Sequence, residues 1–359
     1  MRRAQPATTR PRWRRRAATA VASAVVLIGS QLAFPAGPAA AVDYGVINNN
    51  PAFIQFYANN VENLPRADDK CHGDWLDLVM YMKTYSLSPD IYLVQQISGQ
   101  EQIDNLAARM EKELKGSFRG IAAVANPTVD PVACGAPKAK QTTGIIYRPG
   151  RFTVVNQTRW RANYWNGTKC VNETKDRSAA LGIRFYDTIA KKHVSVSTVH
   201  FPTMTTGDKC IDHNITESGA ETATLGATNL SVWGGDLNNH DQSAGKVFTP
   251  WYNKVNGDRG GALGWRDAIY DACRRANPAD ITNCTYDRNW TIAGENRLRR
   301  IDFLFAKLPG GALPRTDAGR TITFDEGDAA DKAVTTTDRE DRDYSDHRAI
   351  RSRIYYTAG

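Results

Sequence analysis

The stretch LSVWGGDLNNHD, residues 230–241, joins a short apolar segment to a cluster of polar side chains. Leu230 to Trp233 is typical of a buried strand, and two glycines separate it from Asp236 and Asn238. Carboxylate and amide oxygens at the end of a strand are ligands that a hard cation such as Mg²⁺ prefers. Other predicted strands of the chain carry polar side chains at the same kind of position.

These side chains, all capable of binding a metal, recur beside four further predicted strands. Taken singly, such residues usually form turns, cap helices or are hydrogen-bonded core residues. Five sets at one kind of position in one chain indicate a shared site. The four further sets are Asn59 and Asn60 at the end of 53–60, His200 at the end of 193–200, Asp302 within 301–305, and Asp346 with His347 at the start of 347–356.

The chemistry of these sets is specific. Asp and Asn oxygens suit Mg²⁺, which proteins usually hold with one or two carboxylates plus waters and substrate phosphate. Two histidines suit proton transfer to water and to a leaving group. A metal, an aspartate and a histidine together predict metal-assisted hydrolysis of a phosphoester.

The predicted elements favour an α+β fold in which two mixed sheets pack together with helices outside. Several strand pairs with few intervening helices argue against a doubly wound parallel sheet. The predicted helices span 75–85 and 100–115, and the predicted strands include 90–97, the pair 143–147 and 151–159, and the pair 179–186 and 193–200.

Residues 1–41 predict a secretory signal peptide. Seven arginines come with an apolar segment at 17–34, and Ala39 to Ala41 offers a small-residue cleavage site. We therefore expect a secreted, extracellular protein of one domain, 42–359, without stable membrane insertion. Removing the peptide changes the formal net charge from +8 to +1, because 39 basic and 38 acidic residues remain. A nucleic-acid partner is therefore not predicted by net charge, and any basic surface must be local.

Six cysteines in an exported chain predict up to three disulfides. None has the CxxC spacing of a zinc site. Cys273 and Cys284 are close enough in sequence to form a local loop. The other four cysteines, Cys71, Cys134, Cys170 and Cys210, leave three pairings open.

Seven motifs together resemble the endonuclease/exonuclease/phosphatase superfamily, whose type member is deoxyribonuclease I. They occur in the family's order and span 59–350. The resemblance implies a four-layered α/β/β/α sandwich of two packed mixed sheets, deoxyribonuclease I-like, and divalent-metal-dependent cleavage of a phosphoester. The motifs are NNVENL (59–64), LVQQI (93–97), TGIIYRPGRF (143–152), STVHFP (197–202), GGDLNN (234–239), RIDFLF (300–305) and SDHRAI (345–350).

The resemblance implies roles for the histidines and for the groups around them. His347, in the SDH motif, is expected to activate water, and Asp302 is expected to hydrogen-bond that imidazole and fix its tautomer. His200 is expected to stabilise phosphate charge or to protonate the leaving oxygen. Arg177 resembles the family's phosphate-binding arginine just before a strand, although a surface charge at a strand start explains it equally well.

The resemblance also implies a metal site for Mg²⁺, with Mn²⁺ and Ca²⁺ as alternatives. Asn60 and Asp346 are expected to lie at the metal. Asp236 and Asn238 are expected to bind the metal or to position water and phosphate. Gln96 stands where the family has a glutamate that is a principal metal ligand, so it takes the place of a carboxylate with a neutral amide.

The Gln96 departure leaves three interpretations open. The metal is held with lower affinity by the remaining ligands, a nearby acid such as Glu62 or Glu101 compensates, or the chain has lost hydrolysis and kept binding. Gln141 is a second departure from the family pattern. A loose alignment places it where some members keep a glutamate that orients the histidine matching His200.

The leading hypothesis is a secreted, monomeric nuclease that hydrolyses DNA, and possibly also RNA, by attack of water on the phosphodiester. Nucleic acid is then the expected partner. The basic stretch Arg297 to Arg300, beside Asp302, is an expected contact for backbone phosphates, although a solvated surface explains it nearly as well.

Two alternatives to a nuclease are consistent with part of the same motif pattern. A lipid phosphodiesterase such as a sphingomyelinase, or a phosphatase of small phosphoesters, has the same motifs, and Trp160, Tyr164 and Trp165 offer an aromatic loop for a lipid surface. The other alternative is a binding module whose catalysis is weakened by Gln96.

Overall fold

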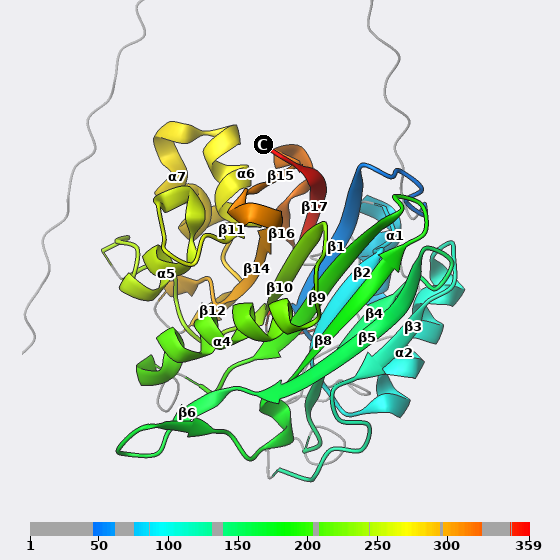
Figure 1. Ribbon diagram of the computed structural model, residues 1–359, viewed down its shortest axis with the longest axis horizontal. Helices are drawn as coiled ribbons and strands as arrows, with labels where there is room; N and C mark the ends of the chain where they lie inside the picture. The colour runs from blue at the N-terminus through cyan, green and yellow to red at the C-terminus, as the bar shows by residue number, and fades with distance from the viewer. Residues whose placement is uncertain are drawn as a thin grey trace, which may run out of the picture. The chain divides into compact units, whose positions relative to one another are not determined.

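Two mixed β-sheets lie face to face, with helices on both outer sides (Figure 1). The computed structural model describes residues 46–61, 75–85, 87–130, 139–203, 208–243, 245–294, 297–324, 345 and 347–359. The predicted signal peptide, 1–41, lies outside these residues, so it and the single domain at 42–359 stay predictions. No helix within the described ranges is long and apolar enough to cross a membrane.

The first sheet has the strand order β15-β17-β1-β2-β4-β3, with β16 also paired to β17. Strands β1 and β2 run parallel, and the other pairs are antiparallel. Its strands are β1 (Phe53–Asn60), β2 (Ile91–Ile97), β3 (Arg119–Ala122), β4 (Thr142–Tyr147), β15 (Pro314–Thr316), β16 (Ile322–Phe324) and β17 (Ala349–Ala358).

The second sheet has the order β11-β14-β10-β9-β8-β5, and its parallel pair is β9 with β10. Two small hairpins, β6 with β7 and β12 with β13, lie outside the large sheets. The strands are β5 (Phe152–Arg161), β6 (Asn163–Trp165), β7 (Cys170–Asn172), β8 (Ala179–Asp187), β9 (Lys192–His200), β10 (Leu230–Asp236), β11 (Arg266–Asp267), β12 (Ile292–Gly294), β13 (Arg297–Arg299) and β14 (Asp302–Lys307).

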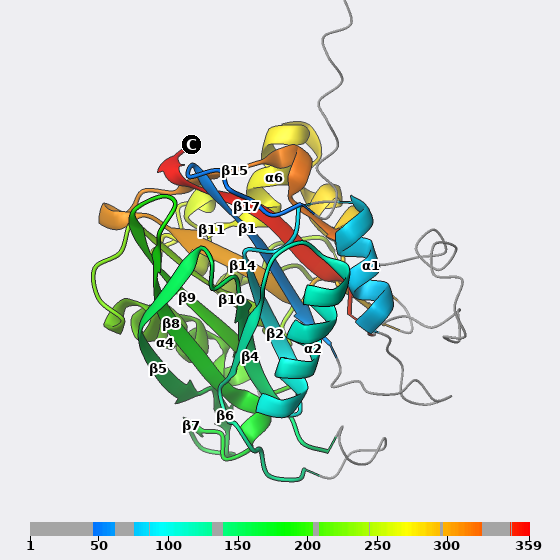
Figure 2. The same ribbon diagram turned by 90° about the vertical axis from the view of Figure 1, so that its right-hand side faces the viewer.

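Helices cover the outer face of each sheet. Figure 2 shows α1 and α2 together over the first sheet, on the side away from β8 and β9. Helices α4 and α5 pack on the second sheet. The helices are α1 (Trp75–Tyr85), α2 (Gln100–Glu113), α4 (Ile211–Thr224), α5 (Pro250–Val255), α6 (Ala268–Ala276) and α7 (Ile281–Asn283), with short turns η1 (Asp176–Ser178), η2 (Asp208–Cys210), η3 (Gly257–Arg259), η4 (Pro278–Asp280), η5 (Cys284–Arg288), η6 (Pro309–Gly311) and η7 (Ala318–Arg320).

The central strands of the two sheets are buried on both faces, and their successive side chains enter different cores. In β1, Ile54 and Phe56 point into the core between the sheets, whereas Tyr57 packs with the residues under α1 and α2. In β10, Val232 belongs to the central core and Trp233 to the core under α4 and α5. This alternation, which has the period of a strand, produces three apolar layers between four structural layers. The predicted α/β/β/α sandwich is confirmed.

One predicted strand pairing is wrong. Residues 143–147 and 151–159 do form strands, β4 and β5, but β4 pairs with β2 and β3 whereas β5 pairs with β8. The chain between them crosses from one sheet to the other, so it does not close a hairpin. The physical reason is the burial of Arg148 and Arg151, whose guanidinium groups are held by carboxylates at the crossing.

The structure contains two disulfides among the described residues. Cys273 is bonded to Cys284, as predicted, and Cys170 is bonded to Cys210. The second bond ties the β6–β7 hairpin to the start of α4. Cys71 and Cys134 lie outside the described residues.

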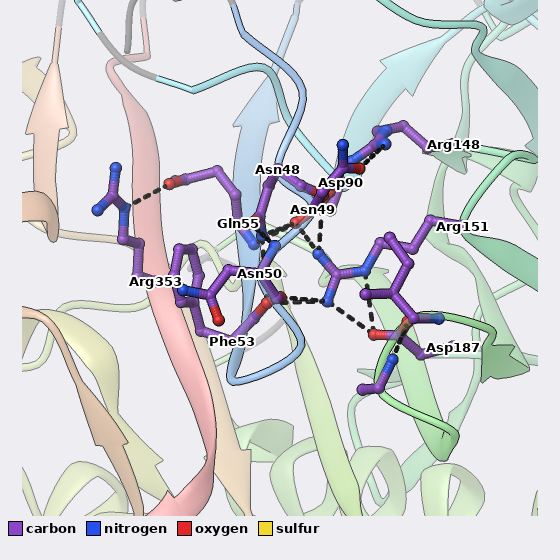
Figure 3. A network of polar contacts seen from close by, with 12 residues as sticks. Asn48, Asn49, Asn50, Phe53, Gln55, Asp90, Arg148, Arg151, Asp187 and Arg353 are labelled. Atoms are coloured by element: carbon purple, nitrogen blue, oxygen red, sulfur yellow. Dashed lines mark hydrogen bonds and ion pairs between the residues drawn. The ribbon is translucent and has the colours of Figure 1, made fainter. Parts of the chain in front are cut away.

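A buried ion-pair network joins the two sheets where β1 and β2 begin (Figure 3). Arg151, which precedes β5, is fully buried and lies 3.0 Å from Asp90, which precedes β2, and 2.7 Å from Asp187 at the end of β8. Arg148 pairs with the second oxygen of Asp90 at 2.6 Å. Burial raises the pKa of Asp90, and the two arginines oppose that effect.

We expect the substitution Arg151→Ala to lower the free energy of unfolding by about 3–5 kcal/mol, because it leaves Asp90 and Asp187 buried with lost partners. Urea unfolding followed by tryptophan fluorescence measures the loss. Arg119→Ala, at an exposed arginine on β3, is the control and should change the value by less than about 0.5 kcal/mol. Equal effects of the two substitutions would show that the network does not stabilise the fold.

Candidate active site

The predicted site residues come together at one end of the two sheets. Asp236, the last residue of β10, is in register with His200 on one side and with Asp302 on the other. Asn60 ends β1, and its side chain donates to Asp236 across the space between the sheets, with an Nδ2–Oδ2 distance of 3.0 Å. Both sheets therefore contribute to one cluster of buried polar side chains.

A short side-chain contact in this cluster joins His347 to Asp302. Nδ1 of His347 lies 2.8 Å from Oδ2 of Asp302, and both side chains are buried. Since a carboxylate only accepts, the pair holds the proton on Nδ1 and directs Nε2 of the ring toward Asp236, 3.8 Å away. This is the orientation that the sequence predicts for a histidine that activates water.

Asp236 is the hub of the cluster. Besides the Asn60 amide, its Oδ2 lies 3.4 Å from Nε2 of His200, and its Oδ1 accepts the backbone N–H of Asn238 at 2.8 Å. The Asn238 side chain donates to the carbonyl of Phe201, just after β9, at 2.9 Å. Asn238 has φ 51°, a left-handed conformation that asparagine tolerates better than most residues. It thereby ties the loop after β10 to the loop after β9.

Burial controls the protonation of this cluster. It lowers the pKa of His200, the neighbouring Asp236 raises it in part, and Arg177 and His347 lower it again. Burial raises the pKa of Asp236, and the nearby Asp302 adds to that effect while the histidines oppose it. The imidazole of His200 is therefore neutral at neutral pH, which favours hydrogen bonding to phosphate over donation of a full positive charge.

Arg177 lies at the edge of the cluster. It precedes β8, its side chain is about a quarter exposed, and its guanidinium is 3.8 Å from Asp130. Its charge acts on His200 through the pKa effect described above. It is placed to meet an incoming anion, although the long contact with Asp130 competes.

The two glutamines of β2 point to different places. Gln95 is buried and its amide donates to Thr198 of β9 at 2.9 Å, while its Oε1 has no hydrogen-bond partner among the described residues. Gln96 has φ 57° at an irregularity in the β2–β4 pairing and accepts a hydrogen bond from Gln141 at 2.9 Å. Gln96 and Gln141, the two departures from the family pattern, therefore form one neutral amide pair.

Sequence reasoning missed two supporting groups. Ser345 donates to the backbone carbonyl of Asn60 at 2.6 Å and accepts the N–H of His347 at 3.1 Å. It thereby fixes the histidine against the end of β1, and its place in the SDH motif was a signal for this role. Gln95 is the second, and its position beside Gln96 in the family motif was the available signal. Asp346, a predicted metal ligand, lies outside the described residues.

The expected phosphate contact at Arg297 to Arg300 is wrong for Arg300. This arginine is buried, with ion pairs to Asp241 at 2.6 Å and to Asp267 at 2.7 Å. Asp241 follows Asp236 in the same loop, and Arg300 comes two residues before Asp302. The arginine therefore connects the chain segment after Asp236 to the segment before Asp302, which is a structural role that composition does not reveal.

The donor set fits a hard divalent cation. Asp236, Asp302 and His347 offer ligand atoms that all lie within 4.8 Å of one another. Oδ1 of Asp302 is buried and has no hydrogen-bond partner in the part of the chain that the structure describes. Carboxylate oxygens are the ligands that Mg²⁺ and Mn²⁺ prefer, and a buried acceptor without a donor suits a cation or its water.

Comparison with known proteins identifies the fold. No protein-family model and no curated protein sequence matches the chain. Among solved structures, the human Nocturnin catalytic domain has a TM-score of 0.53 at 13% identity, covering 86% of this chain and 96% of that one. D. rerio TDP2 has a TM-score of 0.51 at 14% identity, covering 84% and 98%. An endonuclease/exonuclease/phosphatase family protein from Bacteroides thetaiotaomicron has 0.52 at 14% identity, covering 86% and 99%.

The chain therefore has the fold of the endonuclease/exonuclease/phosphatase superfamily, as its seven motifs predict. The matches extend over nearly the whole of each solved chain, so the similarity concerns the complete sandwich. At these identities the similarity establishes the fold.

Gly235 provides a stability test of the site end of β10. It has φ 137°, and a Cβ at this position would lie 2.1 Å from the carbonyl oxygen of Val199. We expect Gly235→Ala to lower the free energy of unfolding by about 2–4 kcal/mol, through the clash with backbone and the strained φ.

The control for this prediction is Gly150→Ala, because no atom lies within 4 Å of a Cβ at Gly150. Thermal unfolding by circular dichroism compares the two variants. A Gly235→Ala protein as stable as Gly150→Ala would mean that β9 and β10 are not packed as described.

Proposed function

We propose that this chain is a secreted, monomeric phosphodiesterase that uses a divalent cation to hydrolyse nucleic acid, with DNA as the leading substrate. The observation that carries the proposal is the buried His347–Asp302 pair directed at Asp236, with His200 on the far side of that carboxylate. The fold supports it, since one protein of the same fold, D. rerio TDP2, was solved with a single-strand DNA product. The two disulfides are compatible with export.

The protein's own residues supply the proton transfer. A water molecule attacks phosphorus and gives its proton to Nε2 of His347, while the P–O bond to the leaving sugar oxygen breaks and that oxygen takes a proton from solvent. The imidazolium that forms at His347 is stabilised by the carboxylate of Asp302 at Nδ1. Asp236 and Asn238 position water and phosphate, and His200 and Arg177 bind the phosphate oxygens by hydrogen bonding and by charge. These roles are those of preorganised groups in a desolvated site.

The cation would be held by Asp236 and Asn60. Further candidate ligands are Asp302, Asp346 and the side-chain amide oxygen of Gln96. When bound, a divalent cation neutralises the charge that develops on the phosphate oxygens. Mg²⁺ is the leading ion, with Mn²⁺ and Ca²⁺ as alternatives.

The lipid alternative has less support. Trp160, one of the aromatic residues expected at a lipid surface, packs against the core under α4 and α5. The ring of Trp165 is covered by the ammonium group of Lys209 at 4.7 Å. These side chains are therefore engaged within the protein, and the aromatic loop that favoured a sphingomyelinase is explained by packing.

The decisive experiment is a substrate panel of plasmid DNA, RNA, sphingomyelin and bis(p-nitrophenyl) phosphate, each with Mg²⁺ and with EDTA. We expect cleavage of nucleic acid that EDTA abolishes, and a loss of turnover of at least about a hundredfold in His347→Ala and in His200→Ala. Circular dichroism checks that both variants fold. A protein that cleaves DNA equally well without His347 would refute the role of the pair, and nucleic-acid binding without any turnover would favour the binding-module alternative.

Substitution of the neutral amide provides a test of the metal site. We expect Gln96→Glu to raise the affinity for Mg²⁺ about tenfold, because Mg²⁺ sites depend on one or two carboxylates and this change adds one. Isothermal titration calorimetry measures the affinity without reference to turnover. Gln157→Glu, at an exposed position on β5, adds the same charge outside the site and is the control. An unchanged affinity in Gln96→Glu would remove this residue from the metal site.

A further inference from the structure

A hollow of about 470 Å³ is lined by residues that lie close in sequence to the hydrogen-bonded pair Gln96 and Gln141. One wall is formed by Ser98, two residues after Gln96, and another by Lys140, which directly precedes Gln141. The hydrogen bond between the two glutamines joins these walls. The volume is in the range of small-molecule sites, roughly 300–1,000 Å³.

The walls of the hollow are held rigidly. Helix α2 starts against the loop after β3, with the N–H of Gln100 donating to the carbonyl of Ala125 at 2.8 Å. Gly99 permits this approach, because it has φ 125° and a Cβ there would lie 2.6 Å from the same carbonyl oxygen. Gln102 accepts the N–H of Ser98 at 2.6 Å and closes the turn. A preformed wall of this kind reduces the entropy lost on binding.

The lining has the chemistry of a site for a neutral planar group. It combines the indole of Trp75, which packs against the core under α1 and α2 and also lines the hollow, with the amides of Asn105 and Asn126, which are both exposed. Among the described lining residues there are one cation and one anion, Lys140 and Glu101, whose charges offset each other. An aromatic face supports stacking of a base, and amides offer both donors and acceptors to the edge of one.

We propose that this hollow is a nucleobase subsite, which binds one base next to the phosphodiester that is cut. The inference rests on the proposed function and deepens it, because it names what the site recognises besides phosphate. A phosphate subsite would need an excess of cations or of backbone N–H donors. An acyl chain would need apolar walls, whereas the described lining offers only Trp75 and Ala125.

The test compares a fluorescein-labelled hexathymidylate with the same oligonucleotide carrying one abasic sugar at successive positions. We expect one position, next to the cleaved bond, at which loss of the base lowers kcat/KM about tenfold, the effect of one stacked base. In Trp75→Ala the ratio of kcat/KM for the intact and abasic oligonucleotides should fall to about one, and Trp75→Phe should retain the preference. Trp165→Ala, at another half-buried tryptophan, is the matched control.

Asn105→Ala and Asn126→Ala provide the same test at exposed positions, where folding is not at risk, and should each lower the ratio. The proposal is overturned if no abasic position affects cleavage, or if Trp75→Ala and both asparagine variants keep the ratio of the unmodified protein. Preferential turnover of sphingomyelin, with no binding of the oligonucleotide, would also overturn it.

A binding measurement separates this proposal from the proposed function. Fluorescence anisotropy on the His347→Ala protein measures the affinity for both oligonucleotides without cleavage. Weaker binding of the abasic oligonucleotide, lost on adding Trp75→Ala, supports the subsite even if the chain proves unable to hydrolyse DNA. Equal binding of the two oligonucleotides by a protein that does cleave DNA rejects the subsite and leaves the hydrolase intact.

Discussion

The fully buried guanidinium of Arg151 is the constraint on which the arrangement of the two sheets depends. It binds Asp90 at the start of β2 in one sheet and Asp187 at the end of β8 in the other, and it also donates to the carbonyl of Phe53 at the start of β1 (Figure 3). A charge so far from water persists only when it is paired and hydrogen-bonded. Strand β1 runs from this network to Asn60, and β2 runs from it to the two glutamines, so the same strands that are fixed at one end deliver polar groups to the site at the other.

At the site end, buried charges again set the geometry. Asp236 and Asp302 lie on neighbouring strands. Arg300, just before Asp302, forms ion pairs with Asp241, which follows Asp236 in the chain, and with Asp267 on β11. Burial raises the pKa of Asp241 to about 6, although Arg300 opposes that rise. The consequence is an array of dipoles and charges that is already in place before a substrate arrives, as the proposed hydrolysis would require.

The sequence predicted the elements with a clear period and the residues at their ends. Strands such as 193–200 and the helix at 75–85 were predictable because their apolar residues recur with the period of a strand or helix, and the strand ends placed His200 and Asp236 correctly. The pairing between strands was harder to predict from the sequence. Residues 148–150 have the composition of a hairpin turn, but the burial of Arg148 and Arg151 directs the chain into the other sheet. Helix α4 was missed because most of Ile211–Thr224 is polar and only a narrow stripe, including Ile211 and Ile215, is buried.

Within the site, the sequence predicted which residues come together but not which side chains hydrogen-bond to one another. The motif showed that Gln96 replaces a carboxylate, whereas only coordinates show that Gln141 bonds to it and that Gln95 turns inward to Thr198. This hydrogen bond suggests one physical reason for both departures from the family pattern, Gln96 and Gln141. In a cluster where burial already raises the pKa of Asp236, another carboxylate would repel both that group and an incoming phosphate. Two amides avoid this repulsion, and under the proposed function the cost is weaker cation binding. We therefore expect the proposed hydrolase to rely more on contacts with its substrate, and less on the cation, to hold the phosphodiester in place.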